Sequence, residues 1–442
     1  MWTSVPFLVF VATVLLLAIP DARGLTFGPK AAWAESEPIA ATFVESTLWP
    51  LRGPKLPTAK QWMAEAIALS FSEFSMQSQA TAPPGGQASP VPSPVPSPAA
   101  TGAGRTPATD WNTLVRAEDQ HSLVPRLTIG WVLDTGTADL ESILKQTPGL
   151  SVLAPKWLHI NGASGALTDT IEPAVVAAAH RQGVKVWAVV DNGFDGPLTH
   201  QFLQYQDTQH RLILHLVQIA QRDHLDGINL DFEGLLNVDR WNYARFVERL
   251  GQRLQALHKS LSVDLPPDYV SGDNSGPYNH AALAHAATYV ILMGYDQYWG
   301  GDSTAGPTAS LPWVQESVAD MIHTGVPADK LILGVPFYTQ AWTLDQRGRV
   351  TASQALSLWQ VRQLLSDQHI KTVWEPRLGL RFGRYRSNGQ IHEIWVEDNR
   401  SLLLTLSLVP DEHLAGAAAW YLGLEYPSTW LSLIDSVRSA IA

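Results

Sequence analysis

Short apolar runs rich in β-branched residues alternate with amphipathic stretches from about residue 119 to the end of the chain. A run of this kind predicts a strand, and apolar residues spaced three and four apart predict a helix. Eight runs predict strands: Leu127–Leu133, Ser151–Ile160, Val184–Val190, Gly227–Phe232, Ser262–Leu265, Tyr289–Met293, Leu331–Pro336 and Gly416–Tyr421. Helical patterns between them are Ile171–Gln182, His210–Arg222, Arg240–Lys259 and Leu311–Thr324.

This alternation indicates an α/β fold made of βαβ units around a parallel sheet. Eight such units in about 320 residues favour a (β/α)8 barrel, the TIM barrel. A doubly wound open sheet is the alternative, but no glycine-rich phosphate-binding motif follows the first run. A long gap separates the seventh and eighth runs. We expect a small α+β insertion there, at about residues 343–414, with β structure over Gly389–Thr405.

The chain before the predicted barrel divides into three parts by composition. Residues 1–24 contain an apolar run, Val5–Ile19, whose length fits a signal peptide better than a full membrane span. No Lys or Arg precedes this run, and a buried helix of a cytosolic domain is the alternative. Residues 25–78 are a short segment of unknown role, and residues 79–118 are a linker rich in Pro, Ala and Ser. We therefore expect a secreted or extracytoplasmic protein, attached to a membrane only if the first segment is kept as an anchor.

Composition excludes several kinds of function. The chain has 30 basic and 41 acidic residues, a formal net charge of −11 and no long Lys/Arg run, which argues against nucleic acid as a partner. It has no cysteine, so disulfides, Cys-ligated zinc and thiol catalysis are excluded. Its 17 tryptophans can supply flat apolar faces for ligand stacking as well as for the core.

The fourth run carries a row of polar residues. Asn229, Asp231 and Glu233 alternate with apolar residues, so on a strand they share one face. Buried carboxylates are costly unless paired, and barrel enzymes keep their active sites at the carboxyl ends of the strands. A polar network that only orders the barrel is the alternative. If Asp231 and Glu233 approach each other, Glu233 should tend to stay protonated, as a general acid requires.

The same stretch resembles a known family. Asp226, Asn229, Asp231 and Glu233 follow the D-G-x-D-x-D-x-E strand of glycoside hydrolase family 18. Three later segments at predicted strand ends are also similar to motifs of that family: Met293–Asp296, Gly334–Tyr338 with Trp342, and Gly416–Trp420. The segments Ile394–Asp398 and Trp420–Glu425 look closest to the branch that hydrolyses spore peptidoglycan.

The resemblance implies that residues 119–442 form a catalytic barrel with a substrate-assisted, retaining mechanism. Glu233 would protonate the leaving glycosidic oxygen and later act as base toward water. Asp231 would hold the acetamido N–H of the substrate, and Tyr295 would donate to its acetamido oxygen. The expected substrate-binding residues are Asn229, Asp296, Met293, Tyr338, Trp420 and Trp299.

Three of those residues have specific expectations. Trp420 would stack under the sugar in the −1 subsite. Trp299 would either stack on a sugar in another subsite or pack against its own loop. Asn229 stands where chitinases usually have aspartate; it can hydrogen-bond Asp231 but cannot share a proton with it. The turn Val190–Gly193 also departs from the serine-glycine-glycine turn of many chitinases.

The resemblance implies a β-N-acetylglucosaminidase that cleaves β-1,4 bonds in N-acetylglucosamine-containing polysaccharide, either peptidoglycan or chitin-like chains. The implied mechanism needs no metal and no cofactor, and we expect a monomer. Because a fold does not fix a function, a non-catalytic sugar- or cell-wall-binding protein on the same barrel is the alternative.

Overall fold

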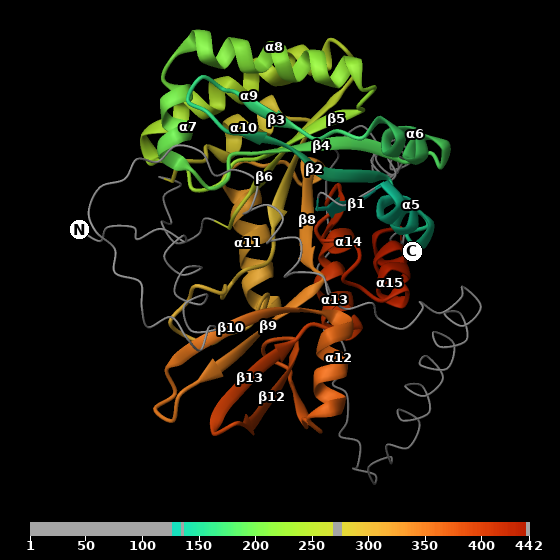
Figure 1. Ribbon diagram of the computed structural model, residues 1–442, viewed down its shortest axis with the longest axis vertical. Helices are drawn as coiled ribbons and strands as arrows, with labels where there is room; N and C mark the ends of the chain where they lie inside the picture. Colours follow the sequence, from blue (N-terminus) through green and yellow to red (C-terminus); the bar gives the residue numbers. More distant parts are fainter. Residues whose placement is uncertain (1–125, 134–136, 268–275, 439–442) are drawn as a thin grey trace, which may run out of the picture. The chain divides into compact units, whose positions relative to one another are not determined.

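The computed structural model describes residues 126–133, 137–267 and 276–438, and within them eight parallel strands close into a barrel (Figure 1). Neighbouring strands follow the order β1, β14, β8, β7, β6, β5, β4, β2, and pairing of β1 with β2 closes the ring. The strands are β1 (Leu127–Val132), β2 (Val152–Ile160), β4 (Lys185–Asp191), β5 (Gly227–Asp231), β6 (Ser260–Leu265), β7 (Tyr289–Met293), β8 (Leu331–Pro336) and β14 (Gly416–Trp420). Each overlaps one of the eight predicted runs, and the TIM barrel is confirmed.

Helices connect the strands and cover the barrel (Figure 1). They are α5 (Thr137–Gln146), α6 (Pro173–Arg181), α7 (Gly196–Leu203), α8 (Gln206–Arg222), α9 (Arg240–Gln255), α10 (His280–Ala286), α11 (Leu311–His323), α13 (Asn399–Leu406), α14 (Leu408–Asp411) and α15 (Pro427–Arg438). The short 3-10 helices are η2 (Asn237–Asp239) and η3 (Ala328–Lys330). Side-chain caps fix the starts of α7 and α10: Asp195 accepts from the Leu198 N–H, and Asn279 accepts from the Ala282 N–H.

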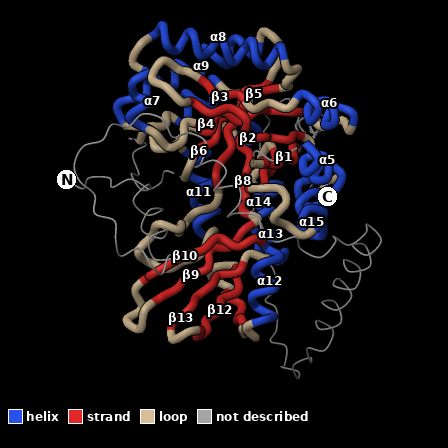
Figure 2. Tube along the Cα trace, in the orientation of Figure 1, coloured by secondary structure: helices blue, strands red, loops and turns tan. Residues whose placement is uncertain are grey.

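A second, antiparallel sheet lies between β8 and β14 in the chain, and both sheets are red in Figure 2. Its strands follow the order β10, β9, β13, β12, β11. The elements are β9 (Tyr338–Leu344), β10 (Val350–Ser357), α12 (Leu358–Asp367), β11 (Thr372–Glu375), β12 (Leu380–Ser387) and β13 (Gln390–Val396). The predicted α+β insertion between the seventh and eighth barrel strands is confirmed.

The expected β structure over Gly389–Thr405 is wrong in its second half. The strand β13 ends at Val396, and Asp398 then caps helix α13 by accepting from the N–H groups of Arg400 and Ser401. This helix packs against α11, α15 and β8, so it belongs to the barrel rather than to the second sheet. The alternating β-branched residues before Val396 masked the capping box that follows them.

The apolar residues form two layers around the barrel wall. Ile228, Leu230 and Phe232 are fully buried in the layer that the strands share with the helices. A separate apolar cluster, which includes Trp131, fills the barrel interior. Its residues come from the barrel strands and the segments next to them. Asn229 bonds to Trp131, so the polar row of β5 faces that interior, as the alternation predicts.

The N-terminal expectations lie outside the described residues: the signal or anchor segment, residues 25–78 and the linker. Among the residues that the structure does describe, no helix is long and apolar enough to cross a membrane.

Candidate active site

Asn229 and Asp231 of β5, followed by Glu233, form a polar row that ends at the carboxyl end of the barrel. Asn229 is fully buried and Asp231, the last residue of the strand, is 7% exposed. Glu233 follows the strand and is partly exposed, so a ligand can reach it. The backbone of Glu233 is held by the side chain of Asn192, which follows β4.

Glu233 has the protonation behaviour of a general acid. Burial raises the pKa of its carboxyl, the negative charge of Asp231 raises it further, and Lys156 lowers it, with a result of about 8. The carboxyl group is therefore protonated at neutral pH and can donate a proton. Burial and the charge of Asp231 are thus the physical basis for the prediction that Glu233 stays protonated.

Asp231 lies beside a lysine. The Lys156 Nζ is 3.6 Å from Asp231 Oδ2 and 3.8 Å from Asp191 Oδ2. On its other side, Asp191 pairs with His159 at 2.8 Å. Burial raises the pKa of Asp231 above its usual value, and the charge of Lys156 offsets only part of that rise.

Asn229 does not hydrogen-bond Asp231, contrary to what its position suggested. Its amide nitrogen donates to Ser262 Oγ at 3.0 Å and to Asp264 Oδ1 at 2.7 Å, which uses both of its hydrogens. Its Oδ1 accepts from Trp131 Nε1 at 2.9 Å. Burial first, and then the charge of Asp231, raise the pKa of Asp264 well above its usual range. Asn229 therefore orders the barrel interior and is not exposed to a ligand.

Aromatic rings line the barrel beside the acids. Tyr295 stacks on Trp420 with ring centroids 6.2 Å apart and an angle of 17° between the ring planes. Trp131 meets Trp420 edge-on at 5.7 Å. Burial raises the pKa of Tyr295 well above its usual range, so its hydroxyl stays neutral and can donate a hydrogen bond. Together these rings form an aromatic cluster that presents one neutral donor, the Tyr295 hydroxyl.

The other predicted site residues lie around the end of β7. Met293 is 7% exposed and belongs to the apolar interior cluster. The hydroxyl of Tyr338 donates a short hydrogen bond to Asp296, whose pKa burial raises. Trp299 is 52% exposed, so its loop does not bury the ring, and the indole is available for stacking. Trp342 is 1% exposed and belongs to a small core cluster with Leu344 and Ile391.

Residues 134–425 match the sequence profile of the glycosyl hydrolases family 18. The chain belongs to this family. It is accordingly a glycoside hydrolase, and its substrate is a carbohydrate.

Several relatives of this family 18 chain have been described. It is 25% identical over 321 residues to the uncharacterized glycosylase YvbX of Bacillus subtilis, with 70% of this chain and 90% of that protein covered. It is 25% identical over 284 residues to the cortical fragment-lytic enzyme of Bacillus anthracis, with 62% of this chain and 65% of that enzyme covered.

Solved structures share the fold of the family 18 barrel. The spore cortex-lytic enzyme SleL of Bacillus megaterium superposes with a TM-score of 0.64 at 24% identity, covering 72% of this chain and 75% of that chain. A chitinase from Chromobacterium violaceum superposes with the same TM-score of 0.64 at 22% identity, covering 71% and 99%.

The family 18 site contains charged residues that the motifs did not reveal: Lys156, Asp191 and Asp264. Each is a charged residue next to buried apolar residues, within or at the end of its strand. That interruption is a signal in the sequence, because a charge in a buried strand is costly without a partner. The partner itself comes from another strand and follows only from the barrel.

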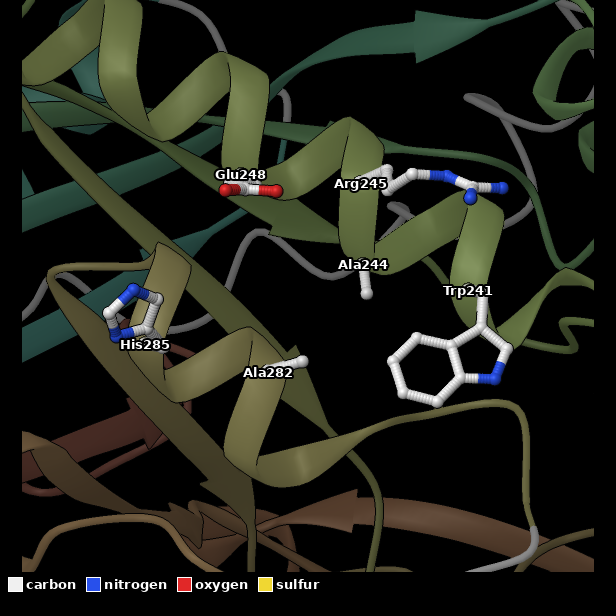
Figure 3. A pocket seen from close by; sticks show the side chains of 6 residues that line it. All are labelled: Trp241, Ala244, Arg245, Glu248, Ala282 and His285. Atoms are coloured by element: carbon white, nitrogen blue, oxygen red, sulfur yellow. The ribbon is translucent and has the colours of Figure 1, made fainter.

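A groove elsewhere on the family 18 barrel lies between α9 and α10 (Figure 3). Trp241, Arg245 and Glu248 border it from α9, and Ala282 and His285 border it from α10. None of these residues belongs to the acid row. Within the described residues, no group of three or more His, Cys, Asp or Glu side chains is placed to hold a metal ion.

Proposed function

We propose that the chain is an exported, retaining β-N-acetylglucosaminidase that cleaves β-1,4 bonds after N-acetylglucosamine in peptidoglycan. One observation carries the proposal: a protonated acid, Glu233, lies next to Asp231, and the neutral Tyr295 hydroxyl and the Trp420 ring lie in the same barrel interior. An acid and an acetamide-binding group side by side suit substrate-assisted hydrolysis.

In the first step, the Glu233 carboxyl gives its proton to the glycosidic oxygen, and the bond from that oxygen to the anomeric carbon breaks. The acetamido carbonyl oxygen of the same sugar forms a bond to that carbon from the other face. Asp231 accepts the acetamido N–H and stabilises the positive charge of the oxazolinium ring, because opposite charges attract strongly in a site with little water. Tyr295 donates to the acetamido oxygen and orients it.

In the second step, water attacks the anomeric carbon and the bond to the acetamido oxygen breaks. The Glu233 carboxylate takes the proton of the water and returns to its starting state. Two displacements at one carbon give net retention. Trp420 supplies the flat face on which the −1 sugar lies.

Peptidoglycan is the preferred substrate class because cortical fragment-lytic enzymes are among the relatives that the chain resembles, over 62% of its length. The apolar N-terminal run agrees with an extracytoplasmic substrate. Chitin-like chains are the second candidate, supported by the chitinase folds among the similar structures. A non-catalytic binding protein has no need for the raised pKa of Glu233 or for the paired Asp231.

The test is digestion of purified peptidoglycan and of chitin oligomers by the full chain, with Glu233→Gln beside the wild type. Mass spectrometry after borohydride reduction identifies the sugar at each new reducing end. We expect new N-acetylglucosamine ends from peptidoglycan and a loss of about 10²–10⁴-fold in rate for the variant, the usual contribution of a general acid.

Glu248→Gln is the matched control, because this exposed glutamate lies on α9 and borders the outer groove. It should cleave like the wild type. Cleavage of chitin oligomers but not of peptidoglycan would support the proposed mechanism and make chitin-like chains the substrate. Near-full turnover by Glu233→Gln, or no cleavage of either polymer, contradicts the proposal.

A further inference from the structure

Lys156 on β2 places its ammonium group beside two buried carboxylates, Asp231 and Asp191. The side chain of Lys156 is 28% exposed, and its Nζ lies 3.6 Å from Asp231 Oδ2 and 3.8 Å from Asp191 Oδ2. The carboxylate side chains are only 8% and 9% exposed, respectively. Water therefore screens these contacts less than it screens a surface ion pair.

The strand is shaped to bring this lysine into the barrel. The pairing of β2 with β4 shifts register between Lys156 and Leu158. Trp157 and Leu158, although adjacent, both pack in the outer apolar layer. Such an irregularity breaks the alternation of faces and redirects a side chain, and bulges of this kind are frequent beside active sites.

We infer that Lys156 is a positioning residue whose ammonium group keeps the Asp231 carboxylate ionised in the free enzyme and so sets the pH range of the reaction. The inference rests on the proposed function, because an ionised Asp231 is what stabilises the oxazolinium ring. It extends that function to a residue outside the motif.

The surroundings of Asp231 explain why a cation is needed. Among the described residues, the titratable groups other than Lys156 that face Asp231 are acids or phenols: Asp191 from β4, Glu233 just after β5, Asp264 from β6, Tyr295 after β7 and Tyr243 from α9. His159 bonds to the far side of Asp191. Burial and the charge of Asp191 both raise the pKa of Asp231, and Lys156 opposes them.

Asn229 makes the lysine more important. In the motif pattern this position carries an aspartate, which could exchange a proton with its neighbour. Here the residue is neutral and its amide is committed to Ser262 and Asp264. The charge state of Asp231 therefore cannot depend on a proton shared with residue 229, and Lys156 is the cation that favours its ionised form.

The experiment compares Lys156→Met and Lys156→Gln with Lys156→Arg in the full chain, measuring kcat/KM from about pH 4 to pH 10 on whichever of peptidoglycan and chitin oligomers the wild type cleaves. Lys156 lowers the pKa of both Asp231 and Glu233. In Lys156→Met and Lys156→Gln, both the acidic and the basic limb of the pH profile of kcat/KM should therefore move to higher pH by on the order of one unit. The profile of Lys156→Arg should stay near that of the wild type. A uniform loss of rate with unmoved limbs overturns the inference.

Lys330→Met is the control, because Lys330 is also partly buried but donates to the carbonyls of Ala284 and Ala287, just before β8 at the opposite end of the barrel. It should leave both limbs in place.

A second readout needs no catalysis. The urea midpoint of Lys156→Met should fall further below that of the wild type as pH rises from about 4 to 8, because the folded state of the variant favours protonated Asp231. In an Asp231→Asn background this growing difference should shrink, and what remains comes from the effect of Lys156 on Glu233 and Asp191. A difference that does not depend on pH contradicts the role of Lys156 even if the chain hydrolyses neither polymer.

Discussion

Asn192 holds the backbone of Glu233 by two hydrogen bonds. Its Nδ2 donates to the Glu233 carbonyl at 2.8 Å, and its Oδ1 accepts from the Glu233 N–H at 2.9 Å. The same amide nitrogen donates to Thr199 Oγ1 at 2.9 Å. Asn192 is 1% exposed, so its amide acts as a fixed clamp between the end of β4 and the proposed acid.

Removing this clamp should affect both stability and turnover. In Asn192→Ala the Glu233 N–H and carbonyl lose their partners, which should cost about 1–3 kcal/mol of unfolding free energy. The rate should fall because Glu233 is no longer held in place. Urea unfolding and kcat measure the two effects, and Asn161→Ala, at an exposed asparagine after β2, is the control. A kcat of Asn192→Ala equal to that of the wild type would show that Asn192 does not position Glu233 for catalysis.

The pH dependence of kcat/KM should have a basic limb near pH 8. Glu233 must be protonated to act as acid, and its pKa is raised to about 8, so the donating form is present below that pH and lost above it. An unperturbed glutamate would lose the proton near pH 4.3. Initial rates at low substrate across this range check the prediction. Activity that falls already between about pH 5 and 6 would argue against Glu233 as the acid.

Asp231→Asn should lower kcat more than it changes KM. The amide can still accept the acetamido N–H, but it has no charge to stabilise the oxazolinium ring. Lys156 then faces a neutral group and loses one of its two carboxylate contacts. Steady-state kinetics on the cleaved polymer separate the two constants. An unchanged kcat would remove Asp231 from the mechanism.

Trp299 and Trp241 allow a matched test of sugar stacking. Both are strongly exposed, at 52% and 61%, but Trp299 follows β7 at the carboxyl end of the barrel and Trp241 lies on α9. Trp299→Ala should raise KM for long oligomers by about two- to tenfold, as expected for about 0.5–1.5 kcal/mol from a stacked ring. Trp241→Ala should leave KM unchanged. Equal effects in both variants would contradict a subsite at Trp299.

Local pattern was enough to predict the barrel and the face of the acid row. The strands are short, apolar and bounded by helices, and alternation in Gly227–Phe232 places Asn229 and Asp231 inside. The capping box at Asp398 was hidden because its signal overlaps a β-branched run.

Pairs between strands could not be predicted in the same way. Lys156 reaches Asp231 because β2 is irregular at that point, and nothing local marks a register shift. Asn229 meets Asp264 because β5 and β6 are neighbours in register, with Asn229 opposite Ser262. Such contacts depend on how the sheet closes, which no single stretch of sequence specifies.

The Asn229–Asp264 pair predicts a compensated exchange of residues. Asn229→Asp alone places two carboxyls where an amide now donates at 2.7 Å, so one must stay protonated. We expect a loss of about 2 kcal/mol or more of unfolding free energy, measured by urea denaturation. Adding Asp264→Asn restores a donor facing an acceptor, and Trp131 still has an acceptor for its N–H.

The double variant should therefore recover most of the stability that Asn229→Asp loses. Because the two residues are in contact, their effects should not add, and the coupling should favour the exchanged pair. The recovery should be largest at neutral pH, where two adjacent carboxyls repel or must bind a proton, and smaller near pH 4, where protonation of one is easy. Strict additivity of the two single substitutions at neutral pH would show that the bond between Asn229 and Asp264 does not order the barrel interior.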